Sequence, residues 1–212
     1  MVTRGKLPPP RKKAEGVYRH GDLRNALLDA ASELVVARSG PDFSLREIAA
    51  RVGVRHTAVY RHFASKEALL SALATRAFER MAKRFKAVED RHGADIDARI
   101  RELAEAYLAM AHEEPGAYRV MFANLSEPDP NCETAAKACF DALVSASTEG
   151  QRRGLMRDDL PAIAIAASNW AALHGFSMLL LDKRLDENVS GGDAEMLSSV
   201  LRKVLREGWL AG

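Results

Sequence analysis

Side chains that can bind a polyanion are concentrated between residues 55 and 66. Arg55 can form a bidentate pair with guanine, His56 can donate to a guanine acceptor, and Thr57 can contact a thymine methyl group. Groups suited to binding phosphates lie on both sides of these three residues: Ser44, Arg46, Tyr60, Arg61, His62 and Lys66. For each of these side chains, the alternative is a solvated helix surface that binds nothing.

Such side chains can read DNA only if short helices hold them, and the pattern before residue 55 predicts the first of these helices. Ser44 and Glu47 have the spacing of a capping box, which begins a helix. Four apolar residues then recur on one helix face: Leu45, Ile48, Ala49 and Val52. Gly53 ends this helix, because glycine accepts the positive φ of a helix C-terminus.

Residues 55–62 are predicted to form a second helix, with Val59 and Phe63 facing the core and polar groups facing outward. A helix–turn–helix requires this division, since the core holds one face while the other enters the major groove. Arg55, His56 and Thr57 occupy the N-terminal turn, which points deepest into the groove when a reading helix docks.

This segment resembles the DNA-binding unit of the TetR family of bacterial transcriptional regulators. The resemblance covers about residues 23–70 and rests on FSLREIA at 43–49, VGV at 52–54, VYRHF at 59–63 and SKEALL at 65–70. It departs at residues 55–58, on the expected reading face, so it defines the fold better than the operator. The resemblance implies an all-α chain, with a three-helix, homeodomain-like DNA-binding domain followed by a helical domain that binds an effector and dimerises.

Charge is distributed unevenly along the chain. Residues 1–66 carry 13 Lys and Arg against 6 Asp and Glu, whereas the remainder carries 18 against 23, which gives net charges of +7 and −5. Residues 1–19 contain three consecutive prolines and six basic side chains, and are predicted to form a flexible basic arm. This arm would either follow DNA phosphates or remain a solvated tail.

Composition and motifs exclude several function classes. The chain has 212 residues, 47% apolar and 28% charged, which is typical of a globular protein with one small and one medium domain. Cys132 and Cys139 lack the spacing of a zinc or redox motif, and two thiols without a secretory signal fit the cytoplasm. The sequence shows no phosphate loop, nucleophile elbow or His-Glu-x-x-His motif. We therefore expect no enzyme activity, no cofactor and no metal.

Helical periodicity continues to the C-terminus, and no alternating strand pattern is present. Helices are predicted over about residues 22–38, 65–87, 94–112, 115–124, 132–153, 159–182 and 193–209. We expect a basic arm over 1–19, a helix–turn–helix DNA-binding domain over 20–66 and an effector-binding and dimerisation domain over 67–212.

Residues 160–181 form an apolar stretch long enough to cross a bilayer. Ser168, Asn169, His174 and Ser177 are spread around the helix, however, and such groups are costly when they face lipid. A helix that is apolar on most sides can instead be buried between its own core and a partner subunit. We therefore expect no membrane partner and a homodimer built through the last two helices.

Trp170, His174 and Gly175 resemble a Trp-…-His-Gly pattern in the C-terminal domain of one TetR subgroup. Trp170 and His174 are four residues apart and share a helix face. The candidate effector pocket comprises Tyr107, Met110, Tyr118, Met121, Phe122, Phe140, Trp170, His174 and Met178. The alternative is a plain core in which Trp170 is buried and His174 has a hydrogen-bond partner.

These patterns together predict a homodimeric DNA-binding transcriptional regulator in the cytoplasm. The resemblance implies a repressor that binds a palindromic operator in double-stranded DNA and is released by a small-molecule effector. The alternative is a helical protein-interaction scaffold without specific DNA readout. That alternative would leave the basic face of the second helix without a role.

Overall fold

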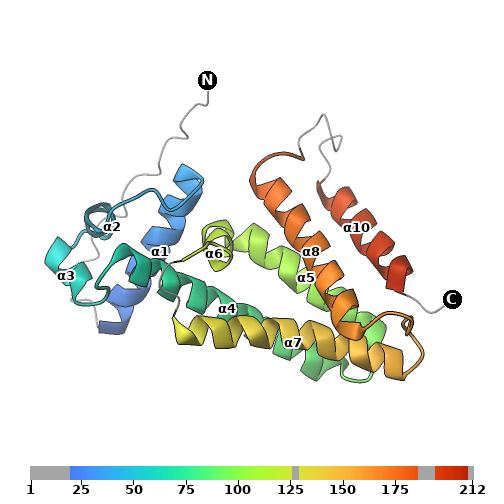
Figure 1. Ribbon diagram of the computed structural model, residues 1–212. Helices are drawn as coiled ribbons and strands as arrows, with labels where there is room; N and C mark the ends of the chain where they lie inside the picture. The colour runs from blue at the N-terminus through green and yellow to red at the C-terminus, as the bar shows by residue number, and fades with distance from the viewer. Residues whose placement is uncertain (1–19, 126–128, 186–193, 210–212) are drawn as a thin grey trace. The chain divides into compact units, whose positions relative to one another are not determined.

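The computed structural model describes residues 20–125, 129–185 and 194–209, and within these ranges the chain is helical (Figure 1). The helices, in chain order, are α1 (His20–Arg38), α2 (Leu45–Val52), α3 (His56–Tyr60), α4 (Lys66–His92), α5 (Ile96–Glu113), α6 (Pro115–Met121), α7 (Pro130–Arg152), α8 (Ala162–Leu181) and α10 (Ala194–Trp209). The predicted all-α fold is confirmed. The predicted basic arm, residues 1–19, lies outside the described residues.

The chain divides into two compact units. Unit 1 comprises residues up to Phe78 together with Glu114–Thr134, and unit 2 comprises Glu79–Glu113 together with residues from Ala135 onward. The first part of α4 and all of α6 therefore belong to the same unit as the predicted helix–turn–helix. The boundary predicted at residue 66 falls inside unit 1.

Unit 1 is built on α1, which packs against α2 and α6. Leu27, Leu28 and Val35 of α1 are fully buried. The approach of α6 to α1 depends on Gly116, because a Cβ atom at that position would lie 2.1 Å from the Ser32 carbonyl oxygen. A side chain at residue 116 would therefore force these two helices apart.

Unit 2 is formed by the second part of α4 with α5, most of α7, α8 and α10. Its fully buried side chains include Met81 and Phe85 of α4 and Leu103 and Met110 of α5. The two cysteines fall in different units and are both buried. Burial raises the pKa of Cys132, and it raises the pKa of Cys139 to about 12.

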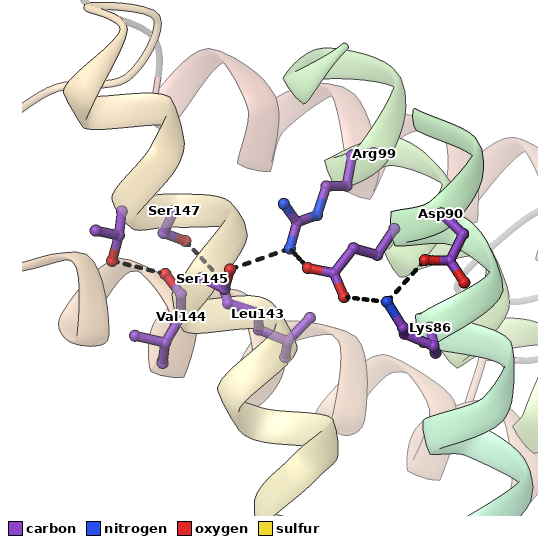
Figure 2. A network of polar contacts seen from close by, with 9 residues as sticks. Lys86, Asp90, Arg99, Leu143, Val144, Ser145 and Ser147 are labelled. Atoms are coloured by element: carbon purple, nitrogen blue, oxygen red, sulfur yellow. Dashed lines mark hydrogen bonds and ion pairs between the residues drawn. The ribbon is translucent and has the colours of Figure 1, made fainter. Parts of the chain in front are cut away.

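A buried arginine joins three helices of unit 2 (Figure 2). Arg99 of α5 donates through Nη2 to Glu89 Oε1 of α4 at 2.9 Å and to Ser145 Oγ of α7 at 3.2 Å. Lys86 lies 3.7 Å from the same glutamate and 2.7 Å from Asp90. Removing Glu89 would leave the buried Arg99 guanidinium without its carboxylate partner, so this network helps to fix how α4, α5 and α7 pack.

In the described part of the chain, the helices α8 and α10 carry apolar side chains that remain exposed. Length and composition would let α8 cross a bilayer, and 22% of its most apolar stretch is buried. The large exposed apolar residues on these two helices are Ile163, Trp170, Leu179, Met196, Val200 and Val204. Within the described residues, α8 is therefore only partly buried, and its burial against a partner subunit stays a prediction.

Candidate nucleic-acid interface and ligand pocket

The capping box that begins α2 is present, and α1 reinforces it. The Ser44 hydroxyl accepts from the Glu47 N–H at 3.3 Å, and Glu47 Oε2 accepts from the Ser44 N–H at 2.8 Å. Arg38, at the end of α1, also pairs with the Glu47 carboxylate. Hydrogen bonds from Arg38 and the Ser44 N–H lower the pKa of Glu47 to about 2. The start of α2 is therefore fixed both by its own cap and by α1.

The turn between α2 and α3 depends on Gly53, which has φ of 80°. Its N–H donates to the Ala49 carbonyl at 2.9 Å, and the Val54 N–H donates to the same oxygen at 2.9 Å. These bonds satisfy the Ala49 carbonyl near the end of α2 and direct the chain into α3.

The helix α3 is shorter than predicted, and it presents the three expected base-reading side chains. Arg55 has extended backbone (ψ of 141°) and precedes the helix as its N-cap, so the helix begins at His56 rather than at residue 55. Val59 and Phe63 are buried, with exposures of 0% and 3%. Arg55, His56 and Thr57 are exposed. The core thus holds one side of α3 and leaves the other open.

The predicted phosphate-binding side chains differ in how available they are. Arg46, Tyr60 and Arg61 are exposed, whereas His62 is half-buried. The Ser44 hydroxyl already belongs to the capping box. Lys66 is half-buried, and its Nζ donates to the Pro41 carbonyl at 3.3 Å and lies 5.9 Å from the centroid of the Phe43 ring. Lys66 would therefore have to exchange internal contacts for a phosphate.

One exposed cation beside the helix–turn–helix was not among the predicted contacts. The guanidinium of Arg24, on α1, lies 5.3 Å from the centroid of the Phe63 ring. This cation–π contact places a positive charge next to the segment that follows α3. Arg24 and Phe63 are far apart in sequence, so no local pattern predicts their contact. The excess of basic residues before residue 66 is the one sequence signal that includes Arg24.

In unit 2, three of the predicted pocket residues form a hydrogen-bonded chain. The Trp170 indole N–H donates to Tyr107 Oη at 3.1 Å, and Tyr107 Oη lies 3.1 Å from His174 Nδ1. Tyr107 Oη therefore accepts from Trp170, and a neutral His174 can either accept from or donate to the same hydroxyl, depending on its tautomer. Burial lowers the pKa of His174 and favours this neutral form. His174 thus has the hydrogen-bond partner that the core alternative predicted.

The nine predicted pocket residues are divided between the two units. Tyr118, Met121 and Phe122 belong to unit 1, and the other six belong to unit 2. Trp170 is 37% exposed rather than buried in a core. A cavity of about 270 Å³ opens beside it among α5, α7, α8 and α10, and Trp170 is the one predicted pocket residue in its lining. Within the described ranges, no three His, Cys, Asp or Glu side chains gather as a metal site.

Comparison with known proteins identifies relatives over both parts of the chain. Residues 27–73 match the family model for bacterial regulatory proteins of the tetR family, and residues 100–204 match that for the tetracyclin repressor-like C-terminal domain. The HTH-type transcriptional activator FasR of Mycolicibacterium smegmatis is 30% identical over 174 residues, which cover 75% of this chain and 79% of FasR.

Solved structures agree with this result. A protein of unknown function from Rhodococcus sp. RHA1 has a TM-score of 0.74 and 29% identity, with 93% of this chain and 100% of that chain covered. The TetR family transcriptional regulator PfmR from Thermus thermophilus has a TM-score of 0.70 over 86% of this chain and 97% of its own. At 17% identity, the likeness to PfmR shows the shared fold alone.

Proposed function

The chain belongs to the TetR family of DNA-binding transcriptional regulators, and from this premise we propose that it is a homodimeric repressor released from its operator by a small molecule. Members of this family regulate transcription and are not enzymes, so no side chain is assigned a catalytic role. Because members of this family bind DNA, membership argues against the alternative of a helical protein-interaction scaffold without DNA readout. We further propose that the protein acts in the cytoplasm, where its DNA would lie.

The observation that carries the proposal is the exposure of Arg55, His56 and Thr57 at the front of a helix whose other side is anchored by Val59 and Phe63. We propose that α3 enters the major groove and that these three side chains contact base edges. Arg46, Tyr60 and Arg61 are exposed and suit phosphates on either side of the groove. Ser44, His62 and Lys66 complete the proposed phosphate contacts.

The exposed apolar side chains of α8 and α10 support a dimer. Ile163, Val200 and Val204 are each about half exposed, which would place much apolar surface in water if the chain remained a monomer. A second copy that presents the same two helices would cover this surface in a symmetric interface. Two copies would also provide two reading heads, which would match a palindromic operator.

We propose that a small molecule regulates the protein by binding in unit 2, beside Trp170 and the hydrogen-bonded pair of Tyr107 and His174. An effector bound there would act by changing the spacing of the two heads. DNA binding requires both heads to match the groove spacing together, so a small displacement can cost much affinity. The proposed subgroup with a Trp-…-His-Gly pattern remains a prediction.

Activation is the second candidate for the direction of control, because the relative FasR is named a transcriptional activator. The DNA-binding step would be the same, and the effect of occupancy on transcription would differ. A reporter gene placed behind the bound sequence separates the two: loss of the protein raises expression for a repressor and lowers it for an activator.

Sequencing the DNA that the purified protein selects from a random pool tests the proposed operator. We expect an inverted repeat whose half-sites are about one helical turn apart, or a multiple of that distance. Selection of a single, non-repeated site would contradict the dimeric mode of binding. Failure to select any sequence would contradict specific readout by α3.

A further inference from the structure

The cavity in unit 2 has an apolar interior. It encloses about 270 Å³ between α5, α7, α8 and α10, and the buried side chains of Leu103, Ala166 and Leu173 contribute to its wall. The chain contains two tryptophans, Trp170 and Trp209, and both line this cavity. The lining therefore suits an aliphatic or aromatic molecular body.

The charged residues in the lining of the same cavity carry an excess of positive charge. These residues are Asp97, Arg101, Glu105, Arg202, Lys203 and Arg206. Arg206 pairs with Asp97 at 2.6 Å, and Arg101 lies 3.6 Å from Glu105. These two pairs leave an excess of two positive charges, on Arg202 and Lys203.

Arg202 is the better placed of the two cations. Its Nη1 donates to the Ser198 hydroxyl at 2.7 Å, and within the described ranges it has no carboxylate partner. Lys203 lies 3.9 Å from Glu207, a residue outside the lining. A guanidinium in the lining of an apolar cavity, with no carboxylate partner of its own, can bind a planar anion through two parallel hydrogen bonds.

A second donor in the lining also lacks an acceptor. The indole nitrogen of Trp209 is shielded from solvent and has no hydrogen-bond partner in the described part of the chain. Tryptophan donates only, and a buried donor left unpaired is unfavourable. The Trp209 nitrogen itself is not exposed to the cavity, so the charge excess is the feature that favours a ligand with an anionic oxygen.

We propose that this cavity binds an amphipathic carboxylate, with its apolar body against Trp170 and Leu173 and its carboxylate at Arg202. A cavity of about 150 Å³ can hold benzene, so one about twice as large accommodates roughly ten to twelve non-hydrogen atoms. The site gives a chemical class to the proposed effector. The role of this site in regulation rests on the proposed function, whereas binding of the ligand does not, because binding can be measured without DNA.

The geometry of α10 connects this site to the proposed dimer. Arg202, Arg206 and Trp209 recur at helical spacing and line the cavity. Met196, Val200 and Val204 are exposed and recur four residues apart, on the opposite side of the helix. One helix thus contacts the ligand on one face and presents an apolar stripe to a second subunit on the other.

The two tryptophans provide a direct assay on the full-length protein. Decanoate is titrated while tryptophan fluorescence and heat are recorded, with decan-1-ol and decyltrimethylammonium as uncharged and cationic probes of similar length. We expect saturable binding of decanoate, with decan-1-ol at least about tenfold weaker because it lacks the charge-assisted hydrogen bonds. Equal affinity for the acid and the alcohol, or no saturable binding of decanoate, would overturn the proposal.

Matched variants locate the carboxylate. Arg202→Gln should weaken decanoate about tenfold or more, and Arg202→Lys should recover part of the loss. Arg152→Gln is the control, because Arg152 is exposed on α7 and lies outside the cavity lining. Thermal melts confirm that each variant is folded. If Arg202→Gln binds decanoate as tightly as Arg152→Gln does, the assignment is wrong.

A parallel assay of DNA binding separates this inference from the proposed function. Decanoate that binds but leaves the operator complex intact supports the site and contradicts its role as an effector site. Release of DNA by a different compound, in a protein that does not bind decanoate, contradicts the site and leaves the proposed function standing.

Discussion

Replacing Glu47 with alanine should loosen the reading head at one defined point, the start of α2. The carboxylate accepts from the Ser44 N–H at 2.8 Å and pairs with Arg38, and its pKa is lowered from 4.5 to about 2. A shift of that size corresponds to about 3 kcal/mol if fully realised. The side chain is 44% exposed, however, and solvent screening reduces the ion pair with Arg38 to about 1 kcal/mol or less.

The lost cap contributes about another 0.5–1 kcal/mol, so Glu47→Ala should lower the local stability of α2 by about 1–2 kcal/mol. Hydrogen exchange of the full-length protein, followed by mass spectrometry, measures this loss as amide exchange about 5- to 30-fold faster over residues 45–52. Glu79→Ala is the matched control, because Glu79 is an exposed glutamate in unit 2. In the Glu79→Ala protein, the amides of α2 should exchange at the wild-type rate.

A double-mutant cycle with Arg38→Ala tests the origin of the effect. The two substitutions should show a coupling of about 0.2–1 kcal/mol, which high salt reduces. Because the folded-state pKa of Glu47 is depressed, its contribution is complete above about pH 4.5 and is lost as the pH falls toward 2. The stability difference between the wild type and Glu47→Ala should shrink over that range. Wild-type exchange rates in Glu47→Ala, or strictly additive effects with Arg38→Ala, would refute this reasoning.

Three further predictions concern the exposed face of α10, the contact between α1 and α6, and the titration of His174. Val204→Glu, at an exposed position on α10, should raise the dimer dissociation constant at least about tenfold in analytical ultracentrifugation, and an unchanged constant would exclude this face as the interface. Gly116→Ala should cost about 1–3 kcal/mol in thermal unfolding, because the added methyl group meets the Ser32 carbonyl, and a wild-type melting temperature would contradict that contact. His174 should titrate below 6.5 by NMR, and its burial should lower stability as the pH falls below about 6.5, because the unfolded chain binds that proton more readily. Tyr107→Phe should shift the His174 titration, and an unshifted one would refute the Tyr107–His174 hydrogen bond.

Local chemistry could be predicted from the sequence because it depends on neighbours within a few residues. The spacing of Ser44 and Glu47 predicted the capping box, and Gly53 predicted the positive φ that ends α2. The apolar positions Val59 and Phe63 predicted which side of α3 is held by the core. The family resemblance predicted the all-α fold, which is confirmed.

Contacts between distant residues could not be predicted in this way. The pairing of Arg38 with Glu47, the bond from Lys66 to Pro41 and the stacking of Arg24 on Phe63 each depend on tertiary packing that no local pattern encodes. The bond from Lys66 matters most for function, because it partly occupies a side chain that was assigned to phosphate.

The candidate pocket was the least predictable feature. The sequence of α8 is apolar on most sides, so periodicity could not show which face of that helix is buried. The sequence therefore predicts Trp170 either in a pocket or in a core. In the structure, Trp170 is partly exposed and lies beside a cavity. Much of the charged lining comes from α10, whose basic residues the sequence did not single out.

Binding of the wild type and Arg55→Ala to the selected operator tests the central claim most directly. Fluorescence anisotropy is measured at two salt concentrations, on the operator and on half-sites changed one base pair at a time. We predict that Arg55→Ala costs about 1–3 kcal/mol on the operator, relaxes the preference at one base pair, and keeps most of the salt dependence that phosphate contacts provide. A folded Arg55→Ala protein with unchanged affinity and unchanged base preference would contradict readout through the front of α3.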